Sequence, residues 1–502
     1  MRNRIAPLLL VLTLCLAPIG ILARASTPLP DDSTWMTVLL DGRKIGYVHI
    51  EYQRNGDTVT TTQTLSIDLH KNGKDLPLGN MTRSVESSGG QPLAFAARTT
   101  LSAMDSTISG QRQPDGRFVV TTTVGGVSRQ QSMDWPPGAL LSEGQRLAFA
   151  GAGEHPGQQY ELRMFDPASL QVAHASMLVL GPEQVTLPGG TATLYHQRQI
   201  IRSPRGPQTV DLWLDERGRT RKGVLSVVGR EMEMLACDRS CALAPAQDVD
   251  MLRTAMVGSP KPLTAPLRGT ELRYRIRVPE GSPPPVIVTG EQHVLDLGHG
   301  EWLVEIGSPG GDGEAPPQPE DSRPNAWLQS DSPTIRRIAA QVVEGAPDDL
   351  QKMEHLRRFV SGYITPHGLD VGYASALEVV IHPQGDCTEY AVLLAALARA
   401  AGIPTRVVTG MVYSDHYGGR SHVFVPHAWV QAWIDGHWQS FDAALRHFDS
   451  SHIALDTGDG DPWHFFNVTN LFPQLQIEDI SPAPPASGPE NQRAGTLRVG
   501  GS

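Results

Sequence analysis

The sequence contains a single long hydrophobic run, and that run stands at its start. Residues 6–22 are largely apolar, two arginines precede them, and Ala23-Arg24-Ala25 supplies a small-x-small cleavage site. This order is typical of a secretory signal peptide over residues 1–25. No later window approaches the roughly 18 uninterrupted apolar residues of a membrane span. We therefore expect a periplasmic or secreted protein without stable membrane insertion after cleavage. An uncleaved anchor is the alternative, because the run needs only a few more apolar residues to span.

Positive charge and aromatic side chains are also scarce. The formal net charge is -11, and removal of a signal peptide with three arginines leaves -14. This acidic balance argues against nucleic acid as a partner. Aromatic residues make up 6% of the chain, but a hydrophobic content of 40% can still fill ordinary cores. A mature chain of about 477 residues is too long for one core, so two or three domains are expected.

The first half of the chain has the two-residue period of β-strands. Apolar and polar side chains alternate from Val59 to Leu69, and hairpin-type turns occur at Asp41-Gly42, Asn55-Gly56 and Asp115-Gly116. This pattern predicts an antiparallel β domain over residues 26–257.

A small β module is expected next, over residues 258–307, after a Pro-rich joint. It is either a separate small sandwich or an extension of the first sheet. Its expected strands are 272–278, 286–289 and 302–306.

Two Gly/Pro-rich segments without apolar periodicity follow in the C-terminal half. Residues 308–324 are acidic and predict a flexible linker, and residues 481–502 predict a disordered tail. Between them the hydrophobic period changes to 3.6 residues. Helices are expected from Pro333 to Glu344 and after Asp348.

One cysteine of the mature chain stands apart from the other two. Cys387 follows Asp386, a good N-cap, and Glu389 completes an acidic capping box, so the thiol takes the first helical position. The helix then runs to Gly402 and is apolar on nearly every side, as in a helix buried inside a domain. The helix dipole favours the thiolate whereas the two acidic residues oppose it, so a nearby base would settle the balance. A small hydrophobic core cysteine is the alternative.

A predicted hairpin supplies a candidate base. Residues 427–444 alternate around the turn Asp435-Gly436. If Ile434 pairs with His437, the other pairs of the hairpin follow from that register.

In this register His427 and Asp442 are diagonal neighbours on one face, about 7 to 8 Å apart at the backbone. The carboxylate can accept the proton of one imidazole nitrogen and leave the other nitrogen to face a thiol. Cys387, His427 and Asp442 then supply a nucleophile, a general base and its orienting acid.

Three segments carry a family resemblance: GDCTEYAVLLAALARAAGIPTRVVTG (385–410), HAWVQAWIDGHW (427–438) and SFDAA (440–444). Together they closely resemble the transglutaminase-like, or papain-like, superfamily, whose bacterial members include exported proteins. The resemblance covers residues 325–475 and not the β-rich half. It implies an α+β domain, with a central helix packed against an antiparallel sheet, that follows the N-terminal β domain. It also implies that Cys387, His427 and Asp442 are the catalytic triad.

The implied reaction is attack of the Cys387 thiolate on an amide carbonyl of a protein or peptide substrate. His427 would protonate the leaving ammonia or amine, and the thioester would pass to water or to an amine. No cofactor is expected. The backbone N–H of Cys387 can donate to the oxyanion, and Gln384 is a candidate second donor, with a loop-surface role as the alternative. The triad does not distinguish hydrolysis from cross-linking. A catalytically silent binding or scaffold protein that uses the β domain is the main alternative.

Two further groups of residues are candidates. Trp429, Trp433 and Trp438 share the triad face in this register and are candidates for a substrate groove, although packing onto the helix is the commoner use of such residues. Cys237 and Cys241 predict a short-loop disulfide in an oxidising compartment, unless the segment is helical and holds the two sulfurs in poor geometry.

Seven histidines between residues 416 and 464 could suggest a metal site, but no pair has the spacing of a zinc protease. Apart from His427, surface histidines are expected, and no metal site is predicted. The seven are His416, His422, His427, His437, His447, His452 and His464.

Overall fold

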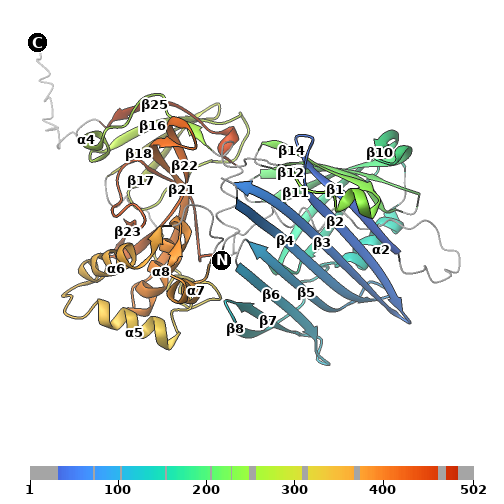
Figure 1. Ribbon diagram of the computed structural model, residues 1–502, viewed down its shortest axis with the longest axis horizontal. Helices are drawn as coiled ribbons and strands as arrows, with labels where there is room; N and C mark the ends of the chain where they lie inside the picture. The colour runs from blue at the N-terminus through green and yellow to red at the C-terminus, as the bar shows by residue number, and fades with distance from the viewer. Residues whose placement is uncertain are drawn as a thin grey trace, which may run out of the picture.

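The computed structural model describes residues 32–71, 74–101, 104–152, 155–203, 206–216, 218–227, 229–247, 256–307, 315–366, 374–461 and 471–483. The predicted signal peptide therefore lies outside the described residues. Within the described ranges, no helix is long and apolar enough to cross a membrane. Figure 1 shows a broad, curved sheet on one side of the molecule and a smaller part containing helices α5 to α8 on the other.

The broad sheet holds 14 described antiparallel strands in the order β8-β7-β6-β5-β4-β3-β2-β1-β14-β13-β12-β11-β10-β9. Its first eight strands are β1 (Asp32–Leu40), β2 (Arg43–Asn55), β3 (Thr58–Lys71), β4 (Lys74–Ser87), β5 (Pro92–Leu101), β6 (Met104–Arg112), β7 (Phe118–Val124) and β8 (Val127–Met133). The remaining six are β9 (Gln159–Asp166), β10 (Gln171–Leu187), β11 (Gly190–Ser203), β12 (Gly206–Leu214), β13 (Thr220–Val227) and β14 (Arg230–Cys237). Two helices accompany the sheet: α2 (Ser142–Ala152) and α3 (Arg239–Ala242).

The turn chemistry of the sequence explains why neighbouring strands of this sheet pair. Asp41 and Gly42 join β1 to β2 with positive φ angles of 47° and 76°. A two-residue turn of this kind matches the right-handed twist of the strands beside it. β1 also pairs with β14, so the first strand joins the two halves of the sheet. The expected antiparallel β region is confirmed.

The smaller part contains two main sheets. The first has the order β15-β22-β21-β24, with β23 paired to β22, and the second has the order β17-β18-β16-β25. Their strands are β15 (Val257–Gly258), β16 (Leu272–Arg277), β17 (Gln292–Gly298), β18 (Glu301–Ile306), β21 (Thr405–Tyr417), β22 (Arg420–Ile434), β23 (His437–Phe441), β24 (His452–Gly458) and β25 (Gln476–Pro482). A short parallel pair joins β19 (Thr365–Pro366) to β20 (Gln384–Gly385).

Helices of this part pack around α8 (Cys387–Ala400), which lies against β21 and β22. The neighbouring helices are α5 (Pro333–Val342), α6 (Asp349–Tyr363) and α7 (Ala376–Ile381). Shorter helical turns are α4 (Ala265–Arg268), η2 (Pro319–Asp321) and η3 (Phe472–Gln474). α5 and α6 agree with the two helices expected from the 3.6-residue period, and the combination of a β-rich first half with an α+β domain is confirmed.

The two parts of the molecule share a hydrophobic core. Met36 of β1, Tyr274 of β16 and Phe424 of β22 are fully buried members of one cluster. A polar contact also joins the parts, because Arg129 of β8 lies 2.5 Å from Asp331, just before α5. The broad sheet and the helical part are therefore packed together.

The small β module expected at 258–307 is completed by a strand from outside that range. β25 follows the helical part in sequence, yet it pairs with β16 at the edge of this sheet. The expected strand at 286–289 is absent from the described fold there, and β17 lies at Gln292–Gly298 instead. A two-residue period in so short a segment does not fix which stretch finds a partner strand.

The Gly/Pro-rich segments also differ from expectation where they are described. Residues 315–324 contain η2, and the carbonyls of Ala315 and Arg323 accept hydrogen bonds from Trp438 and Arg399. This part of the expected linker is therefore held against the α+β domain. Of the expected tail, the first two residues belong to β25, and residues 484–502 lie outside the described residues.

Candidate active site

The nucleophile candidate sits where the sequence predicts it. Cys387 is the first residue of α8, and the Asp386 side chain accepts a hydrogen bond from the N–H of Thr388 at 3.0 Å. Glu389 completes the capping box by accepting from the N–H of Asp386 at 2.9 Å. Gly385 is required before this cap, because a Cβ there would lie 2.4 Å from the Cβ of Glu389. The thiol is thus fixed at the start of a buried helix.

The surroundings of Cys387 favour the thiol over the thiolate. Burial raises the pKa of Cys387 well above its usual value, and the charge of Asp386 adds to this effect. The backbone N–H of Ala428 donates a hydrogen bond to the sulfur and acts in the opposite direction. Burial and Asp386 also raise the pKa of Glu389 well above its usual range. The thiol therefore needs a base, as the sequence suggested.

The base candidate comes from β22, beside the start of α8. His427 precedes Ala428, whose N–H reaches the Cys387 sulfur. The predicted register is confirmed for the paired strands, because Ile434 lies opposite His437 and Val430 opposite Phe441. Asp442 directly follows Phe441, so the hairpin brings the carboxylate back to the level of His427.

The imidazole and the carboxylate make direct contact. Nε2 of His427 lies 2.8 Å from Oδ2 of Asp442, and both side chains are buried. Because Nε2 faces a carboxylate, its proton is donated there, and Nδ1 is left as the nitrogen that can accept a proton.

Asp442 is the most densely hydrogen-bonded group of the site. Its Oδ1 accepts from the backbone N–H groups of Ala444 at 2.7 Å and Leu445 at 3.0 Å. Its Oδ2 accepts from His427 and from Nε2 of His452, the latter at 3.1 Å. Burial opposes ionisation of Asp442, but the charge and hydrogen bonds of the two histidines outweigh it and lower its pKa well below the usual range. The carboxylate is therefore fixed and ionised.

His452 is the residue that sequence reasoning missed. It was expected at the surface, but it is 2% exposed and is the first residue of β24. That prediction is wrong because β24 pairs with β21, which places His452 opposite Val412 in the interior of the sheet. The sequence between Asp442 and His452 has no period that indicates this pairing.

The ligand atoms of His427, Asp442 and His452 lie within 4.8 Å of one another, so the three residues could also surround a cation. However, both imidazoles approach the same carboxylate oxygen at hydrogen-bond distance. A metal site would instead direct the nitrogen lone pairs toward a common centre. The contacts are those of a hydrogen-bonded network.

The three tryptophan candidates do not share one role. Trp429 stacks near the His427 ring at 6.1 Å, whereas Trp433 and Trp438 contact each other at 5.4 Å at the other end of the hairpin. Trp429 and Trp438 are buried, at 2% and 0% exposed, which is unfavourable for the wall of an open groove. They are not part of the hydrophobic cluster around α8 either. The residues of β22 in that cluster include Ala428 and Val430.

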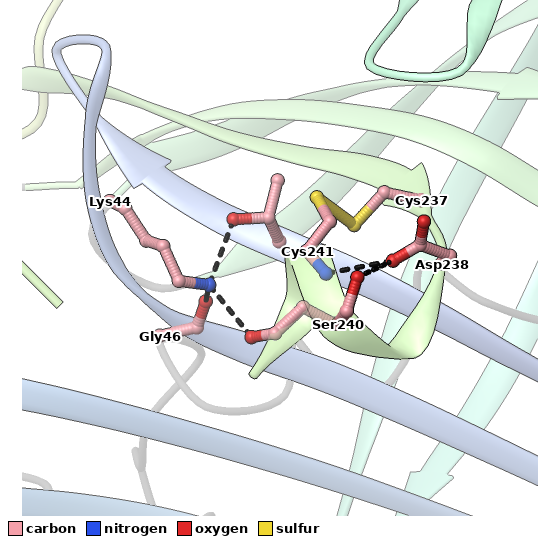
Figure 2. The surroundings of a disulfide bond; sticks show 8 residues. Lys44, Gly46, Cys237, Asp238, Ser240 and Cys241 are labelled. Carbon is pink, nitrogen blue, oxygen red and sulfur yellow. Dashed lines mark hydrogen bonds between the residues drawn. A yellow bond between two sulfur atoms is a disulfide. The ribbon is translucent and has the colours of Figure 1, made fainter. Parts of the chain in front are cut away.

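The remaining candidates lie away from this network. Gln384 is exposed in β20, three residues before Cys387, and stays a candidate oxyanion donor. The structure joins Cys237 to Cys241 in a disulfide at a Cα–Cα distance of 6.0 Å (Figure 2). A one-turn helix is present, but Cys237 precedes its N-cap, Asp238, so only one of the two cysteines is helical.

A hydrogen bond connects the segment that holds the disulfide to β2 of the broad sheet. Asp238 accepts hydrogen bonds from the N–H of Cys241 and the hydroxyl of Ser240 (Figure 2). Lys44 of β2 donates to the carbonyl of Ala242 at 2.7 Å. The disulfide therefore lies at the end of β14 of the broad sheet, whereas Cys387 begins α8 of the smaller part.

Comparison with known families matches residues 336–443 to the transglutaminase-like superfamily. This chain carries a transglutaminase-like domain. The matched range begins in α5, contains Cys387 and His427, and ends directly after Asp442. No curated protein matches the chain significantly.

Several solved structures show low similarity to this chain. A protein from Cytophaga hutchinsonii, provisionally titled a cysteine protease, is 16% identical, with a TM-score of 0.27 over 43% of this chain and 86% of its own. A provisionally titled protease from Parabacteroides distasonis is 13% identical, with a TM-score of 0.20 over 81% and 70%. A β-barrel-like protein of unknown function from Brucella abortus is 12% identical, with a TM-score of 0.34 over 42% and 98%. At these TM-scores the likenesses carry no argument about the site.

Proposed function

We propose that the protein is a cysteine enzyme that cleaves or transfers amide bonds of protein or peptide substrates through a thioester on Cys387. The observation that carries this proposal is the contact between His427 and Asp442 at 2.8 Å, on the strand whose next backbone N–H reaches the Cys387 sulfur. This arrangement supports an acyl-transfer triad in which sulfur, imidazole and carboxylate act in that order.

In the first step, Nδ1 of His427 takes the proton of the Cys387 thiol and the sulfur attacks the amide carbonyl carbon. Because burial and Asp386 raise the pKa of this thiol, proton removal by a base at the site is needed near neutral pH. Asp442 keeps Nε2 of His427 protonated, so that the lone pair lies on Nδ1.

Negative charge then develops on the carbonyl oxygen. The backbone N–H of Cys387 stands at the first position of α8, where a helix supplies no acceptor of its own, so it is suited to stabilise this oxyanion. His427 returns the proton to the leaving nitrogen, and ammonia or an amine departs. Water or an amine then attacks the thioester and frees the sulfur.

We further propose that the protein acts after export by its N-terminal signal peptide. The disulfide between Cys237 and Cys241 supports this proposal, since such bonds persist in oxidising compartments.

The test is incubation of the mature protein with a glutamine-containing protein and a labelled primary amine. Label incorporation identifies a transferase, whereas released ammonia or new chain termini identify a hydrolase. The matched variants are Cys387→Ala, His427→Gln and His437→Gln, the last at the start of β23 and outside the network. The first two are expected to fold and to be inactive, and the third to keep full activity.

Two results would contradict the proposal. Activity that survives Cys387→Ala would place the chemistry elsewhere. Absence of every product from the wild-type protein, across a panel of proteins and peptides, would favour a binding or scaffold role for the broad sheet.

A further inference from the structure

His452 occupies an unusual position for a histidine that no step of the proposed reaction uses. Its side chain is 1% exposed, and its Nε2 lies 3.1 Å from Oδ2 of Asp442. Its Nδ1 lies 3.0 Å from the backbone carbonyl of Asp449, and 3.3 Å from both Oδ1 and the backbone N–H of the same residue. The nearest group to each ring nitrogen is therefore an oxygen acceptor, and one N–H donor also reaches Nδ1.

This geometry favours an imidazolium at residue 452. A neutral imidazole could donate from Nε2 to Asp442 and accept the Asp449 N–H at Nδ1, but it would then leave the closer Asp449 carbonyl, at 3.0 Å, without a donor. Burial alone would lower the pKa of His452, but the hydrogen bonds and charges of Asp442 and Asp449 outweigh it and raise the pKa to about 9.

The second carboxylate beside His452 is that of Asp449, in the segment before β24. Asp449, the loop residue before β24, has its pKa lowered to about 2, chiefly by His452 acting against burial. Arg268 and His447 approach Oδ2 of that second carboxylate at 3.9 and 4.0 Å, whereas His452 approaches its Oδ1. Two aromatic side chains also lie beside the ring: Trp429 and Phe448, at 5.3 and 4.9 Å between ring centroids.

The contacts make Asp442 a shared carboxylate. His427 and His452 approach its Oδ2 from two sides, and their rings lie 5.5 Å apart. A positive charge on His452 offsets the charge of Asp442 as His427 experiences it. His427 is thereby oriented by a carboxylate whose charge is partly balanced by the imidazolium of His452.

We propose that His452 is a positioning residue of the active site, which fixes the Asp442 carboxylate and tunes the proton affinity of His427 through it. The effect on turnover rests on the proposed function. The effect on the two histidine rings does not, and it can be measured without any substrate.

The central experiment is nitrogen-15 NMR of the histidine rings across pH 5 to 10, on the full mature chain with labelled histidine. Wild-type His452 is expected to show two N–H groups and to remain protonated at pH 7.5. In His452→Gln, an amide N–H can still reach Asp442, but the positive charge is gone. Because a unit charge about 5.5 Å away is removed, the His427 ring is expected to titrate about 1 to 2 pH units higher than in the wild type.

His437→Gln is the matched control, since it changes a partly exposed histidine of the same sheet and should leave both rings unchanged. Where substrate turnover is measured, the acidic limb of kcat/KM, which reports the base that must be neutral, should move upward in His452→Gln by the same amount as the His427 ring. His452→Leu, which removes donor and charge together, should lose at least about 100-fold in kcat.

The outcomes separate the two proposals. A His452 ring that is neutral at pH 7.5 overturns the positioning role, even if His452→Gln fails to fold. An unchanged His427 titration in a folded His452→Gln protein overturns it as well. If both rings behave as expected but no amide product forms, the positioning role stands and the proposed reaction fails.

Discussion

Replacement of Asp442 by Asn is the most informative single change in this protein. The carboxylate accepts hydrogen bonds from four N–H groups, at 2.7, 2.8, 3.0 and 3.1 Å. An amide of the same shape has one acceptor oxygen, with room for two of these donors, and an NH₂ group that must face the others. At least two buried donors therefore lose their acceptor in Asp442→Asn.

The catalytic consequence follows from the tautomer of His427. If the amide NH₂ faces Nε2, that nitrogen must present its lone pair, and the ring proton moves to Nδ1. In the proposed mechanism His427 then presents an N–H to the thiol and can no longer take its proton. In acyl-transfer triads this defect reduces kcat by about 10⁴-fold, which corresponds to about 5.4 kcal/mol. We expect a loss of about 10³ to 10⁴-fold in kcat here.

The stability consequence is separate from the catalytic one. Each buried N–H without an acceptor costs about 1 to 3 kcal/mol, so two of them should lower the free energy of unfolding by about 2 to 6 kcal/mol. The assays are steady-state turnover and urea denaturation of the same preparations. Asp435→Asn, in the exposed turn of the same hairpin, is the isosteric control and should change neither quantity.

The reasoning is refuted if folded Asp442→Asn protein keeps more than about one tenth of the wild-type turnover. That result would mean that His427 does not depend on this carboxylate for its tautomer.

Three other outcomes are expected. Burial raises the pKa of Glu86 to about 7, above its value in the unfolded chain. The contribution of Glu86 to stability is therefore present below about pH 4.5 and is lost as the pH rises through 7. Urea titrations should show that the stability of Glu86→Gln, relative to wild type, increases by up to about 3 kcal/mol between pH 4.5 and 8.5. Reduction of the Cys237–Cys241 disulfide, which closes a loop of about five residues, should lower the free energy of unfolding by about 2 kcal/mol without changing turnover. Gly410→Ala should destabilise the protein by about 1 to 3 kcal/mol and slow turnover, because the added Cβ would lie 2.1 Å from the carbonyl oxygen of Ile453, next to His452.

Each of these expectations has a clear contrary result. A pH-independent difference between wild type and Glu86→Gln would show that Glu86 ionises as readily in the folded chain as in the unfolded one. Turnover that falls on reduction in wild type, but not in the double Cys237→Ser, Cys241→Ser variant, would show that this disulfide supports activity and would contradict the prediction. Unaltered stability of Gly410→Ala would show that β21 and β24 separate without strain.

Much of the active site can be predicted from the sequence because its parts are local. The N-cap at Asp386 and the capping box with Glu389 depend on residues three apart, and they place Cys387 at the start of α8. The two-residue turn after Ile434 fixes the register of β22 and β23, and with it the approach of Asp442 to His427 across 15 residues of chain. Turn residues and the side-chain period determine structure over such short stretches of sequence without contacts from the rest of the fold.

What lies farther apart in sequence was decided only by the tertiary structure. His452 enters the network because β24 pairs with β21 rather than with its sequence neighbour β23, and β25 completes a sheet with β16, some 200 residues earlier in the chain. Residues 315–324 look like a free linker by composition, yet they accept hydrogen bonds from Trp438 and Arg399. Backbone hydrogen bonds between strands are the same for nearly every residue type, so strand order is set by the packing of the whole molecule and leaves little trace in any short stretch of sequence.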